Sequence, residues 1–231
     1  MTLVTTFINA LQISFFGLAA LFPKAVSTNK LTKTKGSTTM LMKTELSPFD
    51  TYNLMTKAAL MRIARSEFDV KGSLLSAPLS NPKIAKNAKE NGVNTYGLHL
   101  SPEKQSGFNT CASASDGCKK ACLYSAGHGA FDNVKQGRIN KTRWYIQERE
   151  SFLDKIRKEI DAFIVKAKAK NLTPCIRLNG TSDISWENTG LMDEYKSIQW
   201  YDYTKIYKRA LSFVNGELPS NYHLTYSLNE D

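Results

Sequence analysis

From residue 96 onward, short apolar runs alternate with longer amphipathic runs, and this alternation constrains the fold more than any other feature. Four runs have the composition of buried strands, and they cover residues 96–100, 175–178, 198–203 and 222–227. Between them we expect helices over residues 152–170 and 205–214, with a loop or short helix over 188–197. Strands and helices that alternate in this way are typical of parallel sheets with crossover connections. The sequence therefore predicts an α/β domain.

Four parallel strands are too few to close a TIM-like barrel, which has eight. We expect a partial, open TIM-like barrel of parallel strands with crossover helices, and a cysteine-containing loop over 101–129 after its first strand. Two further helices are predicted ahead of that strand, over residues 51–65 and from Pro82 to about residue 91. Since Asp231 lies close to the last strand, a natural protein that continues past this residue is an alternative to a complete open barrel.

Residues 1–41 differ in composition from the remainder of the chain. The first 23 carry no charged side chain and are largely apolar, a length that suits a membrane span or a signal peptide. A stretch rich in Lys, Thr and Ser, typical of a flexible linker, follows. Three interpretations are open, namely a true start at Met40 or Met42, a membrane anchor, and a cleaved signal. We assign 1–41 to this segment and 42–231 to a single α/β domain.

Three of the four cysteines, Cys111, Cys118 and Cys122, lie within twelve residues. A disulfide scaffold would spread more cysteines over a shorter chain, so this clustering favours a metal or iron–sulfur site. Three thiolates suit a [4Fe–4S] cluster that keeps one iron open, although ligation by four cysteines is commoner. Zinc is the alternative, with His128 or His99 completing the set of four ligands.

The same thiols bear on the compartment, because they must stay reduced to serve as ligands. We therefore predict a cytoplasmic protein. The fourth cysteine, Cys175, lies within an apolar strand, and we interpret it as a core residue.

Polar residues follow each predicted strand, and the carboxyl ends of parallel strands hold the active sites of such folds. Lys205 and Asp183 are the candidate catalytic residues, with Lys205 as a general acid or an anion-binding cation. The candidate cofactor-binding residues are Arg177, Asn179, Gly180, Thr181, Ser227 and Asn229. Structural roles are the alternatives: Arg177 in an ion pair with Asp183, Asn179 and Asp183 in a turn or helix cap, and Lys205 as a solvated surface residue.

The net charge of +10 is compatible with nucleic acid or with a small anionic ligand. Three basic residues, Arg138, Lys141 and Arg143, follow the cysteine loop at near-helical spacing, beside Trp144 and Tyr145. Basic residues next to aromatic side chains can bind nucleic acid. The alternative is that Arg138 packs against the cysteine loop.

Five motifs occur in order in this chain: NTCASASDGCKKACLYSAGHGAF, RINKT, PCIRLNGTSDISWE, WYDYTK and NYHLTYSLNED. Through them, residues 74–231 closely resemble an uncharacterised group of phage and bacterial proteins, the gene product 88 family. The resemblance implies a lineage, and it brings no substrate or reaction with it. A phage-encoded member would be found in the host cytoplasm.

The layout is also similar, more remotely, to that of radical S-adenosylmethionine enzymes. Those proteins carry three cysteines on the loop after the first strand of a partial barrel, where they ligate a [4Fe–4S] cluster whose open iron binds the cofactor. The resemblance implies this role for Cys111, Cys118 and Cys122. Six and three residues separate the cysteines here, against three and two in that family, and Asn179-Gly180-Thr181 matches its glycine-rich segment only loosely.

We therefore expect an iron–sulfur enzyme of the radical S-adenosylmethionine type that acts on an unknown substrate. One alternative is a zinc-stabilised module that binds nucleic acid during the phage cycle, and another is a cluster that is purely structural or redox-sensing. A membrane partner is not expected unless residues 1–23 are a real anchor.

Overall fold

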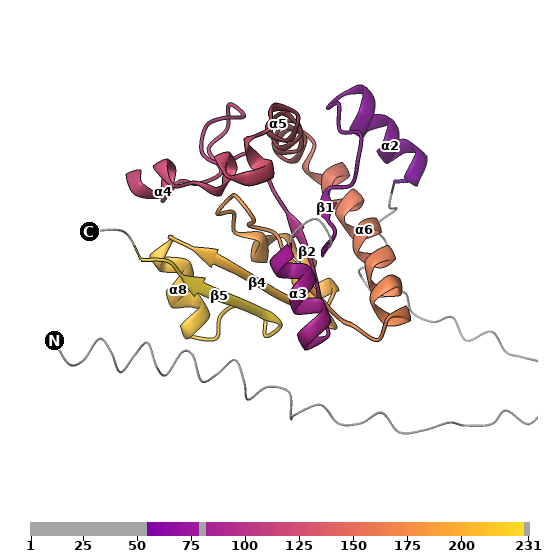
Figure 1. The fold of residues 1–231 in the computed structure, drawn as a ribbon, viewed down its shortest axis with the longest axis vertical. Coiled ribbons are helices and arrows are strands. Elements are labelled where there is room, and N and C mark those ends of the chain that lie inside the picture. The colour runs from indigo at the N-terminus through magenta and orange to yellow at the C-terminus, as the bar shows by residue number, and fades with distance from the viewer. Residues whose placement is uncertain (1–54, 79–81, 229–231) are drawn as a thin grey trace, which may run out of the picture. The chain divides into compact units, whose positions relative to one another are not determined.

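The computed structural model describes residues 55–78 and 82–228, and its five strands form one open sheet (Figure 1). The strands lie side by side in chain order: β1 (Leu75–Ser76), β2 (Val93–Leu98), β3 (Thr173–Arg177), β4 (Gln199–Thr204) and β5 (Tyr222–Tyr226). β1 is antiparallel to β2, and every other neighbouring pair is parallel. The prediction of a mixed α/β fold with an unclosed sheet is confirmed.

Among the described residues, one helix precedes β1 in the chain, and the others lie in the intervals between the strands. They are α2 (Lys57–Ser66), α3 (Pro82–Asn91), α4 (Asp116–Lys120), α5 (Asp132–Gln147), α6 (Arg149–Ala169), α7 (Leu191–Glu194) and α8 (Tyr207–Val214). Short 3-10 turns add η3 (Leu123–Ser125), η4 (Gly127–Ala130) and η5 (Trp186–Thr189). The segments between the parallel strands thus each contain at least one helix, as the predicted crossover connections require.

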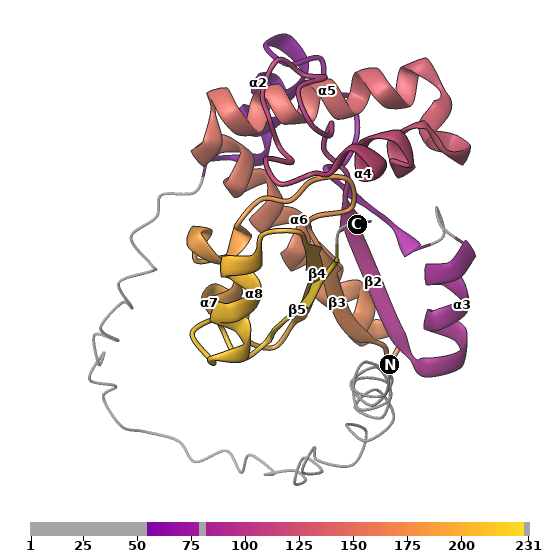
Figure 2. The same ribbon diagram turned by 90° about the vertical axis from the view of Figure 1, so that its left-hand side faces the viewer.

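The order of the strands determines where the core lies. Crossover connections between parallel strands are right-handed, so strands that follow one another in chain order place their helices on one face of the sheet. Figure 2 shows α7 and α8 on one side of the strands, with α3 beside β2. One buried cluster joins the helices to that face, and it includes Ile156, Ile160, Phe163, Leu98, Ile176 and Trp200.

The helical spacing of apolar residues in the sequence explains why α6 forms. Phe152, Ile156, Ile160 and Phe163 recur three or four residues apart and are all buried, while charged residues occupy the opposite face. The predicted helix over 152–170 is confirmed, with bounds of 149–169. Burial of this stripe against the sheet is the main contribution of α6 to stability, at roughly 1.5–3 kcal/mol for each large apolar side chain.

The remaining boundaries differ from the expected ones for local reasons. In the described part of the chain, α2 begins after Thr56, whose hydroxyl accepts a hydrogen bond from the amide of Ala59 at 3.2 Å. The expected cap, Asp50, lies outside the described residues. β2 begins at Val93 and not at residue 96, because Val93 already pairs with Thr173 of β3.

Candidate functional site

The three clustered cysteines lie on the long connection between β2 and α5. Figure 1 shows α4, which contains Cys118, at the outer edge of the domain, apart from α5. One hydrogen bond joins two residues of the connection, and two more fasten it to the domain. The hydroxyl of Thr110 donates to the carbonyl of Ser101 at 2.6 Å, the amide of Ser101 donates to the hydroxyl of Thr142 at 2.8 Å, and the amide of Asp183 donates to the carbonyl of Thr110 at 2.8 Å.

All three cysteines are free thiols and half-buried. The sulfur of Cys111 lies 3.8 Å from the carbonyl oxygen of Thr181, in the segment after β3. Burial raises the pKa of Cys111, and smaller contributions in the same direction come from Cys122 and Asp183. Cys111 and Cys122 are therefore close enough to interact electrostatically. Cys118 follows a helix cap in which the hydroxyl of Ser115 accepts its amide hydrogen at 3.3 Å.

The three thiols do not converge on one point. Within residues 55–78 and 82–228, no group of three or more His, Cys, Asp or Glu side chains is arranged to hold a metal ion. The donor types and the half-buried setting fit a thiolate-bound metal or cluster, because soft sulfur ligands select zinc and iron–sulfur groups. Ligation by all three cysteines would require their side chains to draw closer together.

Arg138 of α5 connects the cysteine segment to the sheet end. Its Nη1 donates to the carbonyl of Tyr124 at 3.4 Å, and its guanidinium carbon lies 5.6 Å from the centre of the Tyr124 ring. Gly129 makes this contact possible, since a Cβ there would lie 2.6 Å from the Tyr124 carbonyl and 3.1 Å from Nη1 of Arg138. The packing of Arg138 against the cysteine segment is thus observed.

The two candidate catalytic residues are brought together. The amide of Lys205 donates to Oδ2 of Asp183 at 2.9 Å, while its Nζ donates to the carbonyl of Leu228 at 2.8 Å. The other carboxylate oxygen of Asp183 accepts from Nη1 of Arg209 at 2.7 Å. The carboxylate of Asp183 is therefore held by two donors, and its catalytic role stays a prediction.

Arg209 is the principal residue that the sequence reasoning missed. It is buried, and its Nε and Nη2 donate to the two oxygens of Glu187, each at 2.8 Å. Together with Asp183 and Tyr222, this ion pair joins α8 and β5 to the segment after β3. The only signal for this role in the sequence is the presence of an arginine within a predicted amphipathic helix.

Arg177 pairs with a different carboxylate from the expected one. Its Nε lies 3.9 Å from Oδ1 of Asp202, whereas Asp183 pairs with Arg209. The expected pair Arg177–Asp183 is therefore wrong, because the buried position opposite Arg177 belongs to β4. Burial raises the pKa of Asp202 to about 7. The guanidinium carbon of Arg177 also lies 5.0 Å from the centre of the Tyr203 ring.

The segment after β3 is rigidly bonded to itself and to its neighbours. The side-chain oxygen of buried Asn179 accepts three hydrogen bonds, from Ser182, Ile184 and Trp186, at 2.9, 2.9 and 3.1 Å. The hydroxyl of Thr181 donates to the carbonyl of Leu100. These bonds hold the loop, so a role of Asn179 or Thr181 toward a cofactor stays a prediction.

Two more of the predicted cofactor-binding residues donate their backbone amides to neighbouring strands. The amide of Gly180 donates to the carbonyl of Leu98 at 3.0 Å, beside His99. Ser227 follows β5, and its amide donates to the carbonyl of Thr204 at 2.8 Å. Asn229 lies outside the described residues.

The histidines considered as zinc ligands have different settings. His128 in η4 is exposed, and its ring centre lies 5.8 Å from that of Phe131. His99 directly follows β2 and is half-buried. Neither belongs to a metal-holding group in the described part of the chain.

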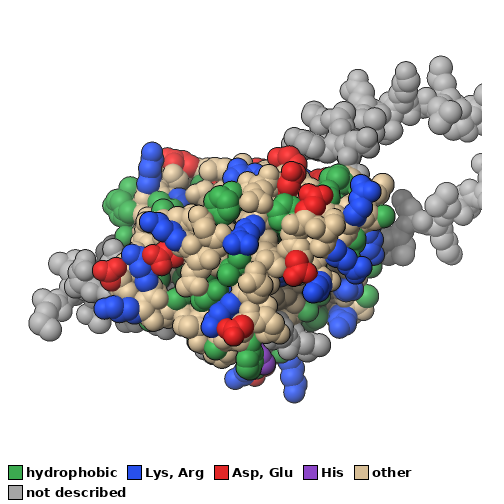
Figure 3. All heavy atoms as spheres, turned by 90° about the horizontal axis from the view of Figure 1, so that it is seen from above, with side chains coloured by type: hydrophobic (Ala, Val, Ile, Leu, Met, Phe, Trp, Pro, Cys, Tyr) green, Lys and Arg blue, Asp and Glu red, His purple; other side chains and the backbone are tan. Residues whose placement is uncertain are grey.

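The basic residues proposed to meet nucleic acid do not form one exposed stripe. Lys141 has its Nζ bonded to the carbonyl of Leu74 at 2.9 Å, and burial lowers its pKa to about 8. Arg138 is half-buried, and only Arg143 of the three is exposed. In the view of Figure 3, lysine and arginine side chains are interspersed with acidic and hydrophobic ones.

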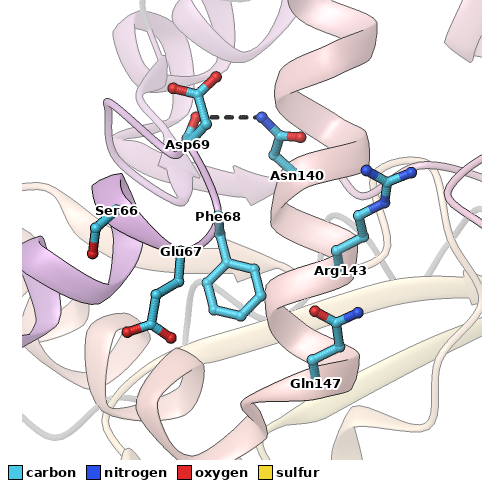
Figure 4. Close-up of a pocket in the computed structure, with 7 residues that line it drawn as sticks. All are labelled: Ser66, Glu67, Phe68, Asp69, Asn140, Arg143 and Gln147. Atoms are coloured by element: carbon cyan, nitrogen blue, oxygen red, sulfur yellow. Dashed lines mark hydrogen bonds between the residues drawn. The ribbon is translucent and has the colours of Figure 1, made fainter.

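A depression between the end of α2 and α5 lies apart from the predicted site, and Figure 4 shows the side chains around it. It has a volume of about 410 Å³ and is lined by Ser66, Glu67, Phe68, Asp69, Asn140, Arg143 and Gln147. The side-chain Nδ2 of Asn140 donates a hydrogen bond across this depression to the backbone carbonyl of Asp69, at 3.3 Å. Of the residues singled out in the sequence, it contains only Arg143.

Comparison with known proteins gives one match. A family model described as gene product 88 matches residues 73–231, which is more than half of the chain. Curated proteins and solved structures gave no match. None of the helices over 55–78 and 82–228 has both the length and the apolar character that crossing a membrane would require.

Proposed function

The chain belongs to the gene product 88 family, and we propose that it is an iron–sulfur enzyme whose cluster is held by Cys111, Cys118 and Cys122. The observation that carries the proposal is the setting of these thiols. They are free and half-buried, and they lie on a connection fastened to the segment after β3.

The strand order supports a radical S-adenosylmethionine type of reaction. β2, β3, β4 and β5 are parallel and lie in chain order, and a partial TIM-like barrel would have the same strand order. The cysteine connection follows β2, the first parallel strand. A bound cluster would supply one-electron chemistry, which protein side chains do not provide.

The chain's own residues would position the reactants. Arg177 offers a cation next to the aromatic ring of Tyr203, and Arg138 places a second cation close to Cys122. Lys205, with its amide on Asp183, is proposed as the proton donor or anion-binding cation. Thiolate ligands suit a reducing compartment such as the cytoplasm.

The first experiment is a metal analysis of the full chain purified without oxygen. We expect roughly four irons with matching sulfide and a broad absorption band at about 400 nm. The variants Cys111→Ala, Cys118→Ala and Cys122→Ala should each lose the band. Cys175→Ala is the matched control, because Cys175 is buried in β3 and is not a proposed ligand. S-adenosylmethionine binding would then be measured by calorimetry on the iron-loaded protein.

Two results would contradict this function. Stoichiometric zinc without iron would replace it with the zinc-stabilised binding module, and a steep salt dependence of DNA binding would then be expected. A band that survives all three cysteine substitutions would remove these thiols as ligands.

A further inference from the structure

One group of side chains lies near the carboxyl ends of β2, β3 and β4, and contacts within the domain satisfy its polar atoms only in part. Arg177 is the last residue of β3 and pairs with Gly97 of β2, two residues before His99. Tyr203 of β4 lies under the Arg177 guanidinium and is 48% exposed. Arg177 and His99 are both half-buried, so solvent reaches this group.

Two glycines make room for the His99 ring. A Cβ on Gly180 would lie 2.6 Å from Cδ2 and 2.8 Å from Nε2 of His99. A Cβ on Gly97 would lie 3.3 Å from Cε1 of the same ring. The imidazole therefore lies directly against the backbone of β2 and of the segment after β3. It makes no hydrogen bond with any residue over 55–78 and 82–228, so its nitrogens are available to a ligand.

The surroundings of His99 are positively charged. Burial first, and then the charges of Arg138, Lys141 and Arg177, lower the pKa of His99 to about 4. At neutral pH the ring is therefore uncharged, and it can donate one hydrogen bond and accept another. Lys141 is partly offset by Glu159, which leaves Arg138 and Arg177 as the principal cations of the group.

Not all hydrogen-bond donors of Arg177 have a partner among the described residues. Its Nε is buried without a hydrogen-bond partner among the described residues, and its nearest carboxylate oxygen, on Asp202, is 3.9 Å away. That distance is too long for a hydrogen bond. A buried donor without a partner costs roughly 1–3 kcal/mol. The rest of the guanidinium, on a side chain that is 29% exposed, is open to a ligand with oxygen atoms.

We infer that Arg177, His99 and Arg138 form a binding site for an oxyanion, a phosphate or carboxylate group on a small molecule. Arg177 binds the anion by charge-assisted hydrogen bonds, neutral His99 donates one more, and Arg138 contributes charge from α5. Tyr203 offers an exposed aromatic surface to the apolar part of the same ligand. This anion site rests on the proposed function, and it adds to that function the charge of the ligand.

The test uses inorganic phosphate and the full chain, without added iron. The chain has three histidines, and NMR of labelled imidazole carbons reports on each. The His99 resonances should shift and reach saturation with phosphate, while exposed His128 and His223 stay unchanged. Arg177→Gln should weaken phosphate binding by at least about tenfold. Lys166→Gln, which removes an exposed charge from α6, should leave it unchanged.

Absence of a His99 shift, or equal shifts of all three histidines, would overturn the site. If Arg177→Gln fails to fold, Arg138→Gln provides the same comparison. A second titration with S-adenosylmethionine identifies the source of the oxyanion. Displacement of phosphate would assign the site to the cofactor's carboxylate, and simultaneous binding would assign it to an anionic substrate. Because iron is not measured here, failure of the cluster and failure of the anion site are distinguishable.

Discussion

Nη1 of Arg209 lies 2.7 Å from Oδ1 of Asp183, and the two side chains are only 7% and 12% exposed. This ion pair joins α8 to the segment after β3. The amide of Lys205 uses the second oxygen of Asp183, so one carboxylate fixes the start of the connection from β4 to α8. Asp183 therefore has a demonstrable structural role, whatever its part in chemistry.

The Asp183→Asn substitution should destabilise the protein by about 2 kcal/mol. A neutral amide weakens the bond to Arg209, although Glu187 still neutralises that arginine. Chemical denaturation at neutral pH measures the change. Asp132→Asn is the control, because the Asp132 side chain is 99% exposed, and it should alter stability by less than about 0.5 kcal/mol. Equal effects of the two substitutions would show that the buried pair contributes nothing.

Gly129→Ala should destabilise the cysteine segment. The added Cβ would lie 2.6 Å from the carbonyl oxygen of Tyr124 and 2.9 Å from that of Leu123, so backbone must move, at a cost of roughly 1–3 kcal/mol. Gly137→Ala is a matched control in α5, where a Cβ meets nothing within 4 Å. It should stabilise by roughly 0.5–1 kcal/mol. Thermal unfolding distinguishes the two, and a stabilised Gly129→Ala variant would contradict this packing.

Stability should depend on pH through His99. Its pKa is about 4 in the folded protein and 6.5 in the unfolded chain, so between these values the unfolded state binds more protons. The contribution of His99 to the free energy of unfolding is therefore fully present above pH 6.5. It is lost as the pH falls toward 4, and the total loss is about 3 kcal/mol. His99→Gln should remove this part of the pH slope in denaturation experiments from pH 4 to 7.

The control for that slope is His128→Gln, because His128 is exposed. Its slope should match that of the unsubstituted protein. If His99→Gln keeps the full slope as well, the uncharged state assigned to the buried imidazole is wrong.

Local sequence determined those elements whose signal lies within a few residues. The stripe of Phe152, Ile156, Ile160 and Phe163 determines α6, because one helical face then buries large apolar side chains. Pro82 at the first position and Gly92 beyond the last bound α3, which spans the predicted residues. The order of strands and helices led directly to the α/β class.

Elements without a local signal were not predicted. β1 has two residues, and it exists because Leu75 and Ser76 pair with Leu98 and Gly97 of β2. α4 lies within a stretch expected to be loop, and the cap by Ser115 gives it one short helical segment. Neither has a hydrophobic period long enough to be recognised.

The sequence by itself determined the chemical character of the site: three thiols after the first parallel strand, and polar residues after the next strands. Only the tertiary structure decided which charged groups meet. Arg177 pairs with Asp202 and Asp183 with Arg209, because strand register and helix docking bring together residues that lie about twenty-five positions apart. The arrangement around His99 is likewise tertiary, since Gly97 of β2 and Gly180 in the segment after β3 allow the backbone to approach its ring closely.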